Sequence, residues 1–441
     1  MIKSTGMANS IDCSEARVKR VEFRGSSRMS KKLKRTMLAS HKGDNDAAES
    51  QGRLGDLPDN LIHHILSFME TKDAIRTSFL SRRWRYMWTS VPCLNFNSKS
   101  FSRLADFKRF VKRVLSQRDT SHIKALTYCR FGVDYATDQS LLNKVIEFAT
   151  SHGVEEIRIN LRGKSSGSPP IEIPSSLFAC RSLKRIELKD CHPTNVPPSV
   201  GCKSLEMLHL EHFPLHPGQA NSSNPFSSIQ KLFGFTKLTT LHLNSFTLSC
   251  TGTGRLDPFA DCVNLKNLHL SEICFKSDLN PRDFVISAPQ LSNLTLVCNR
   301  LKCKLVVAAP QLTNFSYIYS SPCALFDFGL PSLDDLTIDI HELHDQLEIY
   351  QRRHREETLH GFINVLWRHH NVEAVKLSFH TVMATCGAAA LLKCEDSSFI
   401  KSKSLNLGVG STYKIFISDV DRITAYYRSF SQHTDFEIST F

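Results

Sequence analysis

One short hydrophobic pattern recurs along most of this chain and restricts its possible folds more than any other feature. An apolar residue is followed by two variable residues, a second apolar residue, one variable residue and a third apolar residue. Ten copies begin at Ile123, Val154, Leu183, Leu205, Leu238, Leu265, Leu291, Leu312, Leu333 and Val372. The starts lie 21 to 39 residues apart. A single copy would carry no weight, but regular recurrence at this spacing indicates a repeat protein.

The end of each copy has the residue pattern of a short strand. In SLEMLHLEHF, Leu208 and Leu210 alternate with His209, so the leucines face one side and the histidine faces the other. No copy is long enough to bury its own leucines, so neighbouring copies must stack with their strands side by side in a parallel sheet. The pattern is therefore typical of a leucine-rich-repeat solenoid, whose exposed strand face is a binding surface.

The same alternation assigns a set of side chains to the exposed strand face. The candidates for binding a partner are Glu187, His209, Glu211, His242, Asn244, Asn267 and His269. Three successive copies place histidine at the same position, which predicts a column of imidazoles if the strands pair in register. The pattern fixes no carboxylate or thiol beside this column, so a partner-contacting or solvated surface is favoured over a zinc site.

Residues 54–96 precede the repeats and have a different character. Apolar residues recur at helical spacing from Leu61 to Met69, Thr71 is placed to cap a second helix, and Ser81 is placed to cap a third. The third helix would carry Trp84 and Trp88 on one side. About forty residues are too few to build a core of their own, so the segment is expected to dock on another surface.

This segment resembles the F-box of plant F-box/leucine-rich-repeat proteins, in its opening LPDNLIHHILSF and its close TKDAIRTSFLSRRWRYMWTSVP. The resemblance implies that it binds the SKP-family adaptor of an SCF-type (cullin-RING) ubiquitin ligase and, through it, a cullin. By position, adaptor contacts or the packing that supports them fall on Leu57, Pro58, Leu61, Ile65, Leu66, Ile75, Leu80, Trp84 and Trp88. Glu70 departs from the family, which usually has proline there; the change is expected to loosen the turn. The alternative is a helical corner packed against its own domain.

These observations predict the organisation of the whole chain. The fold class is α/β, with a small helical F-box followed by an irregular leucine-rich-repeat solenoid that forms a curved parallel sheet. The expected parts are a disordered basic tail (1–53), the F-box (54–96), a helical linker (97–122), leucine-rich repeats (123–380) and an atypical C-terminal cap (381–441), which includes the strand-like TYKIFISDV.

The charge of the chain is concentrated at its beginning. Of the net charge of +12, residues 1–53 contribute 12 Lys and Arg against 6 Asp and Glu, which gives +6. Lys31, Lys32, Lys34 and Arg35 form a candidate nuclear-import run, although a solvated basic tail has the same composition. We therefore expect a nuclear or cytoplasmic protein, and nucleic-acid contact only through this tail.

Several other classes of protein are disfavoured by the sequence. No apolar run approaches the roughly 18 residues that span a bilayer, so no membrane segment is expected. The 14 cysteines are scattered without a CxxC pair, which favours reduced thiols. Neither the phosphate loop GxxxxGK[ST] nor the zinc motif HExxH occurs. We therefore expect no catalytic residue, cofactor or metal in this chain.

The function that this combination favours is that of a substrate-recognition subunit, in which the F-box holds the ligase and the repeats hold a protein substrate. A basic-tailed scaffold associated with chromatin or RNA is the alternative, and its binding would weaken steeply with salt. A receptor for a small ligand is a third possibility, which would need a deep pocket in the strand face.

Overall fold

The computed structural model describes residues 57–131, 139–161, 172–191, 202–211, 235–248, 254–275, 282–298, 303–319, 326–328, 330–340, 374–378, 404–409 and 435–440. The chain divides into two units, Met1–Asp56 and Leu57–Phe441, and every described residue belongs to the second. The basic tail predicted for residues 1–53 lies outside the described residues.

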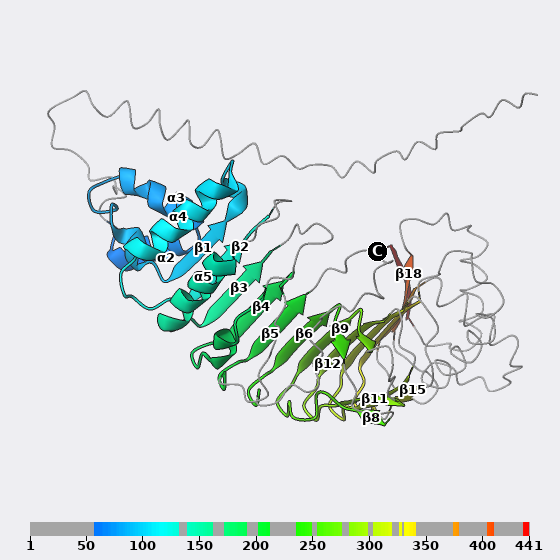
Figure 1. The fold of residues 1–441 in the computed structure, drawn as a ribbon. Helices are drawn as coiled ribbons and strands as arrows, with labels where there is room; N and C mark the ends of the chain where they lie inside the picture. Colours follow the sequence, from blue (N-terminus) through cyan, green and yellow to red (C-terminus); the bar gives the residue numbers. More distant parts are fainter. Residues whose placement is uncertain are drawn as a thin grey trace, which may run out of the picture. The chain divides into compact units, whose positions relative to one another are not determined.

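A parallel sheet of thirteen strands forms the body of the described part, and its strands lie side by side in the order in which they occur along the chain. Figure 1 shows successive strands side by side. The strands are β1 (Cys93–Asn97), β2 (Ala125–Cys129), β3 (Glu156–Asn160), β4 (Arg185–Lys189), β5 (Met207–Glu211), β6 (Thr240–Asn244), β9 (Asn267–Ser271), β12 (Asn293–Cys298), β14 (Asn314–Tyr319), β16 (Asp335–Ile340), β17 (Ala374–Ser378), β18 (Ser404–Val409) and β19 (Asp435–Thr440). All ten copies of the repeat pattern form strands, β2 to β17 in this order, which confirms the predicted solenoid.

Three strands of the sheet were not among the predicted copies. Strand β1 has the full pattern, with Val91, Leu94 and Phe96 buried, but it lies in the segment that resembles an F-box. Strands β18 and β19 lack the first apolar residue, because Ser402 and His433 stand at that position. The strand-like TYKIFISDV lies outside the described residues.

The boundary between the helical segment and the repeats therefore differs from the prediction. Residues 97–122 are not a linker before the repeats, because the sheet already begins at β1 and the helix α4 (Leu104–Gln117) connects β1 to β2. Phe107, Val111 and Val114 recur at helical spacing and are buried in the repeat core. A second helix, α5 (Gln139–Ser151), makes the next connection in the same way.

The connections change character along the chain. After a 3-10 turn at Ser175–Ala179, the described parts of the connections contain short strands: β8 (Arg255–Leu256), β11 (Asp283–Ser287), β13 (Lys304–Ala308) and β15 (Phe326–Phe328) form a parallel sheet of four, and β7 (Thr247–Leu248) pairs with β10 (Cys274–Phe275). The copies that begin at Leu265, Leu291 and Leu312 are 26 and 21 residues apart, which leaves room for a short strand but not for a helix of α4's length.

The residues before the sheet form two short helices, α2 (Asp59–Ser67) and α3 (Thr71–Arg76), followed by 3-10 turns at Thr77–Phe79 and Met87–Ser90. The predicted third helix is wrong, because residues 82–86 form turns. An α-helix would direct Trp84 and Trp88 to one side, whereas here Trp84 packs with Ile62, Leu66, Ala74 and Val91 and Trp88 joins the repeat core.

The two predicted helix caps have different outcomes. Thr71 is not a cap, because it is the first residue of α3 and Glu70 occupies the N-cap position without a side-chain cap. The Thr71 hydroxyl instead accepts a hydrogen bond of 2.8 Å from the Asn95 N–H of β1. Ser81 does accept a bond of 3.3 Å from the Trp84 N–H, although the segment that follows is a turn.

The inward leucines carry the stability of the sheet, which leads to a direct test. Leu241 is 0% exposed and His242, the next residue, faces the other side of β6. Leu241→Ala should lower the free energy of unfolding by ~2 to 5 kcal/mol, since it removes buried carbons and leaves a cavity. His242→Ala is the matched control and should cost less than ~1 kcal/mol. Denaturant unfolding monitored by circular dichroism measures both, and the reverse ranking would mean that the strand register is wrong.

Candidate functional site

Exposed apolar side chains are concentrated in the helical segment, which we define as residues 57–90. Among the described residues, six large hydrophobic side chains are exposed, and five of them lie here: Leu61 (45%), Ile65 (41%), Phe68 (77%), Phe79 (88%) and Tyr86 (69%). Leu61, Ile65 and Phe68 are spaced by four and three residues, so they share one face of α2 and its C-terminal end. Exposed apolar side chains concentrated in so short a segment are typical of an interaction surface.

The structure divides the predicted adaptor-binding residues into three groups. Pro58, Leu61 and Ile65 are exposed and available for contact. Leu57, Ile75 and Leu80 are partly buried, and Leu66, Trp84 and Trp88 are buried. The same segment thus packs against the chain's own cores with some of these residues and exposes others to solvent.

Three exposed side chains of this surface were not predicted as site residues. Phe68 follows Leu61 by seven residues, so helical spacing alone was a usable signal. Phe79 lies in a 3-10 turn and Tyr86 in the turns at 82–86, where no periodic pattern applies. Only the fold brings these two aromatic side chains to the surface.

Glu70, the residue that departs from the family pattern, connects the helical segment to the sheet. One carboxylate oxygen accepts a hydrogen bond of 2.7 Å from the Asn97 amide, and the other accepts one from the Ser100 hydroxyl. Lys72 donates to the Ser100 carbonyl and lies 4.0 Å from the centre of the Phe101 ring. Charge-assisted contacts of Glu70 and Lys72 thus hold the start of α3 against the end of β1 and the residues that follow it. The sequence had suggested a loosened turn at Glu70, and the structure shows a well-bonded one.

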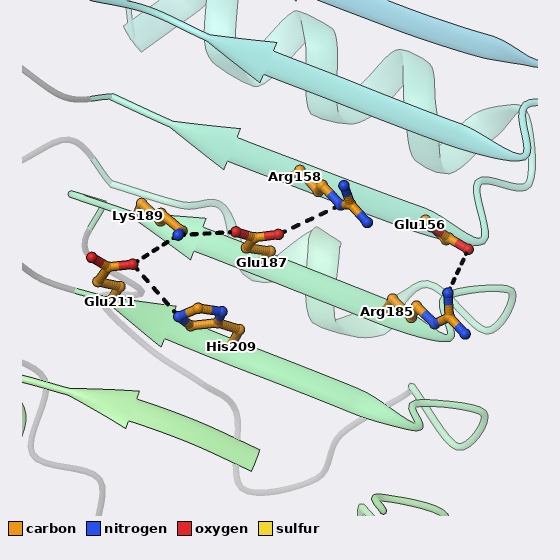
Figure 2. Close-up of polar contacts among 7 residues, drawn as sticks. All are labelled: Glu156, Arg158, Arg185, Glu187, Lys189, His209 and Glu211. Carbon is orange, nitrogen blue, oxygen red and sulfur yellow. Dashed lines mark hydrogen bonds and ion pairs between the residues drawn. The ribbon is translucent and has the colours of Figure 1, made fainter. Parts of the chain in front are cut away.

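The outward face of strands β3 to β5 carries a paired set of charges. Figure 2 shows this chain of contacts. Arg158 lies 3.5 Å from Glu187, and Lys189 lies 3.2 Å from Glu187 and 2.9 Å from Glu211. Burial opposes the charge of Lys189, but its hydrogen bonds to Glu211 and Glu187 raise the pKa of the ammonium group. A separate pair joins Arg185 to Glu156 at 3.2 Å.

The predicted column of histidines is confirmed. His209, His242 and His269 occupy register positions on β5, β6 and β9, and their ring centres are 5.1 and 5.3 Å apart. Burial is the main cause that lowers the pKa of all three imidazoles. Lys189 lowers the pKa of His209 further, while Glu187 and Glu211, the latter 3.6 Å away, oppose this shift. The other two imidazoles lower the pKa of His242 further, and Glu187 opposes it. The column is therefore neutral at pH 7.

A ladder of asparagines runs parallel to the histidine column. The Asn293 amide donates to the Asn267 carbonyl oxygen at 2.7 Å, and the Asn314 amide donates to Asn293 at 2.8 Å. The Asn267 amide in turn donates to the Thr240 hydroxyl at 3.2 Å. Asn267 was predicted as a site residue, whereas the hydrogen-bonded row that extends it was not.

The described residues contain no candidate metal centre, and two of their buried thiols are unreactive. No group of three or more His, Cys, Asp and Glu side chains among them could hold a metal ion. Burial raises the pKa of the Cys202 and Cys262 thiols to about 12, so neither is a thiolate at neutral pH. No helix in the described part is long and apolar enough to cross a membrane.

The sequence does contain one match to the nucleophile-elbow pattern GxSxG, GKSSG at residues 163–167, which lies outside the described residues. An elbow serine needs a strand before it and a helix after it. Strand β3 precedes the match, but Pro169 and Pro170 follow it and disfavour a helix there. The match therefore does not indicate a hydrolase.

Comparison with known proteins supports two parts of this description. The F-box domain family matches residues 54–96. F-box/LRR-repeat protein 25 of Arabidopsis thaliana is 34% identical over 146 residues, which cover 33% of this chain and 52% of that protein. A putative F-box/FBD/LRR-repeat protein of the same plant is 28% identical over 248 residues, covering 56% of this chain and 53% of the relative. These matches span about half the length of each relative.

The histidine column predicts a dependence of stability on pH. The pKa of each imidazole is lower in the folded chain than the ordinary value of 6.5. As the pH falls, the unfolded chain therefore binds protons before the folded chain does. The contribution of these histidines to the free energy of unfolding is complete above pH 6.5 and is lost as the pH falls through the folded pKa values.

His269→Asn removes the positive charge that His269 carries when protonated. The pKa of His209 and of His242 should therefore rise, and the melting temperature should fall less on acidification.

Titration of the histidine ring protons by NMR, together with melting curves across the acidic range, measures both effects. His64→Asn is a suitable control, because it removes a histidine from the exposed part of α2, outside the column. Unchanged titration of His209 and His242 in the His269→Asn variant would show that the three rings are not electrostatically linked.

Proposed function

Because this chain is a plant-type F-box/leucine-rich-repeat protein, we propose that it is the substrate-receptor subunit of an SCF-type ubiquitin ligase. The observation that carries this proposal is the exposed apolar surface of the helical segment. It lies within the F-box match and includes side chains as exposed as Phe79, at 88%. The buried Trp84 packs against Ile62 and Leu66 of α2, the helix that carries part of this surface.

The proposed division of labour follows from the two surfaces. The helical segment binds a SKP-family adaptor and, through it, a cullin, while the outward face of the sheet binds a protein substrate. Proteins of this family are generally non-catalytic, and the chemistry belongs to other subunits. This chain contributes proximity, since it raises the effective concentration of a substrate lysine near the ubiquitin carrier.

The junction at Glu70 gives this mechanism a structural basis. An adaptor can hold a substrate at a useful distance only if its two binding surfaces keep a constant relation. Glu70, Thr71 and Lys72 tie the start of α3 to β1 and the residues after it. Ile75 of α3 also packs against the repeat core. The contacts between α3 and β1 thus join the helical segment, which would bind the ligase, to the sheet, which would bind the substrate.

The substrate surface that we propose includes the residues predicted from the repeat pattern. Glu187, His209, Glu211, His242, Asn244, Asn267 and His269 all have intermediate exposure and lie on four consecutive strands, β4, β5, β6 and β9. Their register positions are adjacent, so one partner can contact several of them at once.

Adaptor capture tests the proposed function. Ile65→Ala combined with Phe79→Ala should weaken binding of a purified SKP-family adaptor at least about tenfold, because a buried large apolar side chain is worth ~1.5 to 3 kcal/mol. Both side chains are exposed, so the fold should be unaffected. Val263→Ala removes a similarly exposed apolar side chain from the repeats and is the control. Equal adaptor binding by the double variant and the wild type would refute the assignment.

Nuclear import through the basic run remains a prediction, and we propose it as the role of Lys31, Lys32, Lys34 and Arg35. Import receptors recognise clustered Lys and Arg side chains, and this cluster lies in the segment with net charge +6. Changing all four residues to Ala should shift a fluorescent fusion of the full chain from the nucleus to the cytoplasm. An unchanged distribution would leave the run without this role.

A further inference from the structure

The outward face of the sheet contains a continuous band without charged residues. Strands β6, β9, β12 and β14 are consecutive in the sheet and contain no Asp, Glu, Lys or Arg. In contrast, β3 to β5 carry the ion pairs of Figure 2, and β16 carries Asp335 and Asp339. We call the outward side chains of β6, β9, β12 and β14 the neutral band.

The neutral band offers mainly hydrogen-bonding groups, together with two apolar side chains, Val297 of β12 and Ile318 of β14, which are register neighbours. It contains two of the three imidazoles of the histidine column, His242 and His269, and the asparagine ladder beside them. The imidazoles are neutral because burial lowers their pKa. The planes of these two rings differ by 21° and their centres are 5.3 Å apart. Both side chains are partly exposed, so both can offer hydrogen bonds to a partner. Thr295 and Ser316 continue the histidine column with hydroxyl groups.

The cations that β3 to β5 display on the outward face form ion pairs with carboxylates of the same strands. Arg158 and Lys189 both form ion pairs with Glu187. Lys189 also pairs with Glu211, and Arg185 pairs with Glu156. Recognition of a phosphorylated or acidic segment relies on Arg or Lys groups that are free to form such pairs. A partner that brought a phosphate onto the band would bury that charge without a counter-charge, which is far more costly than burying an amide or a hydroxyl.

We infer that the neutral band binds an uncharged, unphosphorylated polypeptide segment rich in amide and hydroxyl side chains, which is the class of substrate that this receptor recognises. That the bound segment is a substrate rests on the proposed function. That it is uncharged is inferred from the side chains of the sheet face alone. Recognition of this kind depends little on salt, because it does not release counter-ions or pair exposed charges.

Synthetic peptides of equal length, presented to the full chain without the adaptor, test the inference. One set contains Asn, Gln, Ser, Thr, Tyr and Gly; a second carries phosphoserine or Asp at alternate positions; a third carries Lys there. We expect binding to be confined to members of the first set and to change less than about twofold between low and high salt. Preferred binding of the acidic, phosphorylated or basic set would overturn the inference, as would a lack of binding by any set.

Two matched substitutions assign the binding to the band. Asn244 on β6 and Asn160 on β3 occupy the same column of the sheet, which runs through Lys189 and Glu211. Asn244→Asp adds a charge to the neutral band with almost no change in size and should weaken peptide binding at least about tenfold. Asn160→Asp makes the same change among the ion pairs and should change binding less than about threefold, as should the uncharged Asn244→Ser.

Controls separate this inference from the proposed function. Adaptor capture and melting temperature are measured for each variant, because the band lies far along the sheet from the helical segment and neither quantity should change. Normal peptide selectivity with absent adaptor capture would refute the ligase role and leave the binding class intact. Equal peptide binding by Asn244→Asp and the wild type would refute the band as the site.

Discussion

The stack of inward leucines between in-register parallel strands is the constraint on which the rest of this structure depends. Leu208, Leu241 and Leu268 occupy one register line, and each is at most 2% exposed. Each strand's leucines are covered by those of the next strand, so the core continues as one cluster from Trp88 to Val375. The outward side chains are placed by the same register, because residues alternate between the two faces. Function on the outer face is thus positioned by packing on the inner face.

A stack of this kind needs its first strand protected, and the helical segment provides that protection. Strand β1 has a neighbour on one side only, which leaves backbone groups that could pair with another chain. The Thr71 hydroxyl binds the Asn95 N–H of β1, and Glu70 binds the Asn97 side chain at its end. The segment that presents the proposed adaptor surface therefore also closes the sheet. This dual role explains why part of the segment must pack against its own chain while the other side stays exposed.

Much of the sheet could be predicted from sequence, because it depends on a local pattern. Ten copies of the pattern gave ten strands and the correct histidine column, since the alternation of a strand fixes which residues share a face. Strands β18 and β19 were missed where Ser402 and His433 replace the first apolar residue. The role of Thr71 depends on Asn95, 24 residues later, and helical spacing carries no information about such a contact. The same holds for Phe79 and Tyr86, whose exposure is decided by tertiary packing.

The inner and outer faces of the sheet obey different rules, and this separation determines how recognition is encoded. Inward positions accept only apolar residues of suitable size, because each must fill the space beside its register neighbours. Outward positions have no such limit, so the face changes from ion pairs on β3 to β5, to amides and imidazoles on β6 and β9, to aspartates on β16. The position of a residue along the chain determines where its side chain lies on the outer face. The chemical type of that side chain determines what it can bind. A substitution on the outer face can therefore change the partner without disturbing the stack that displays it.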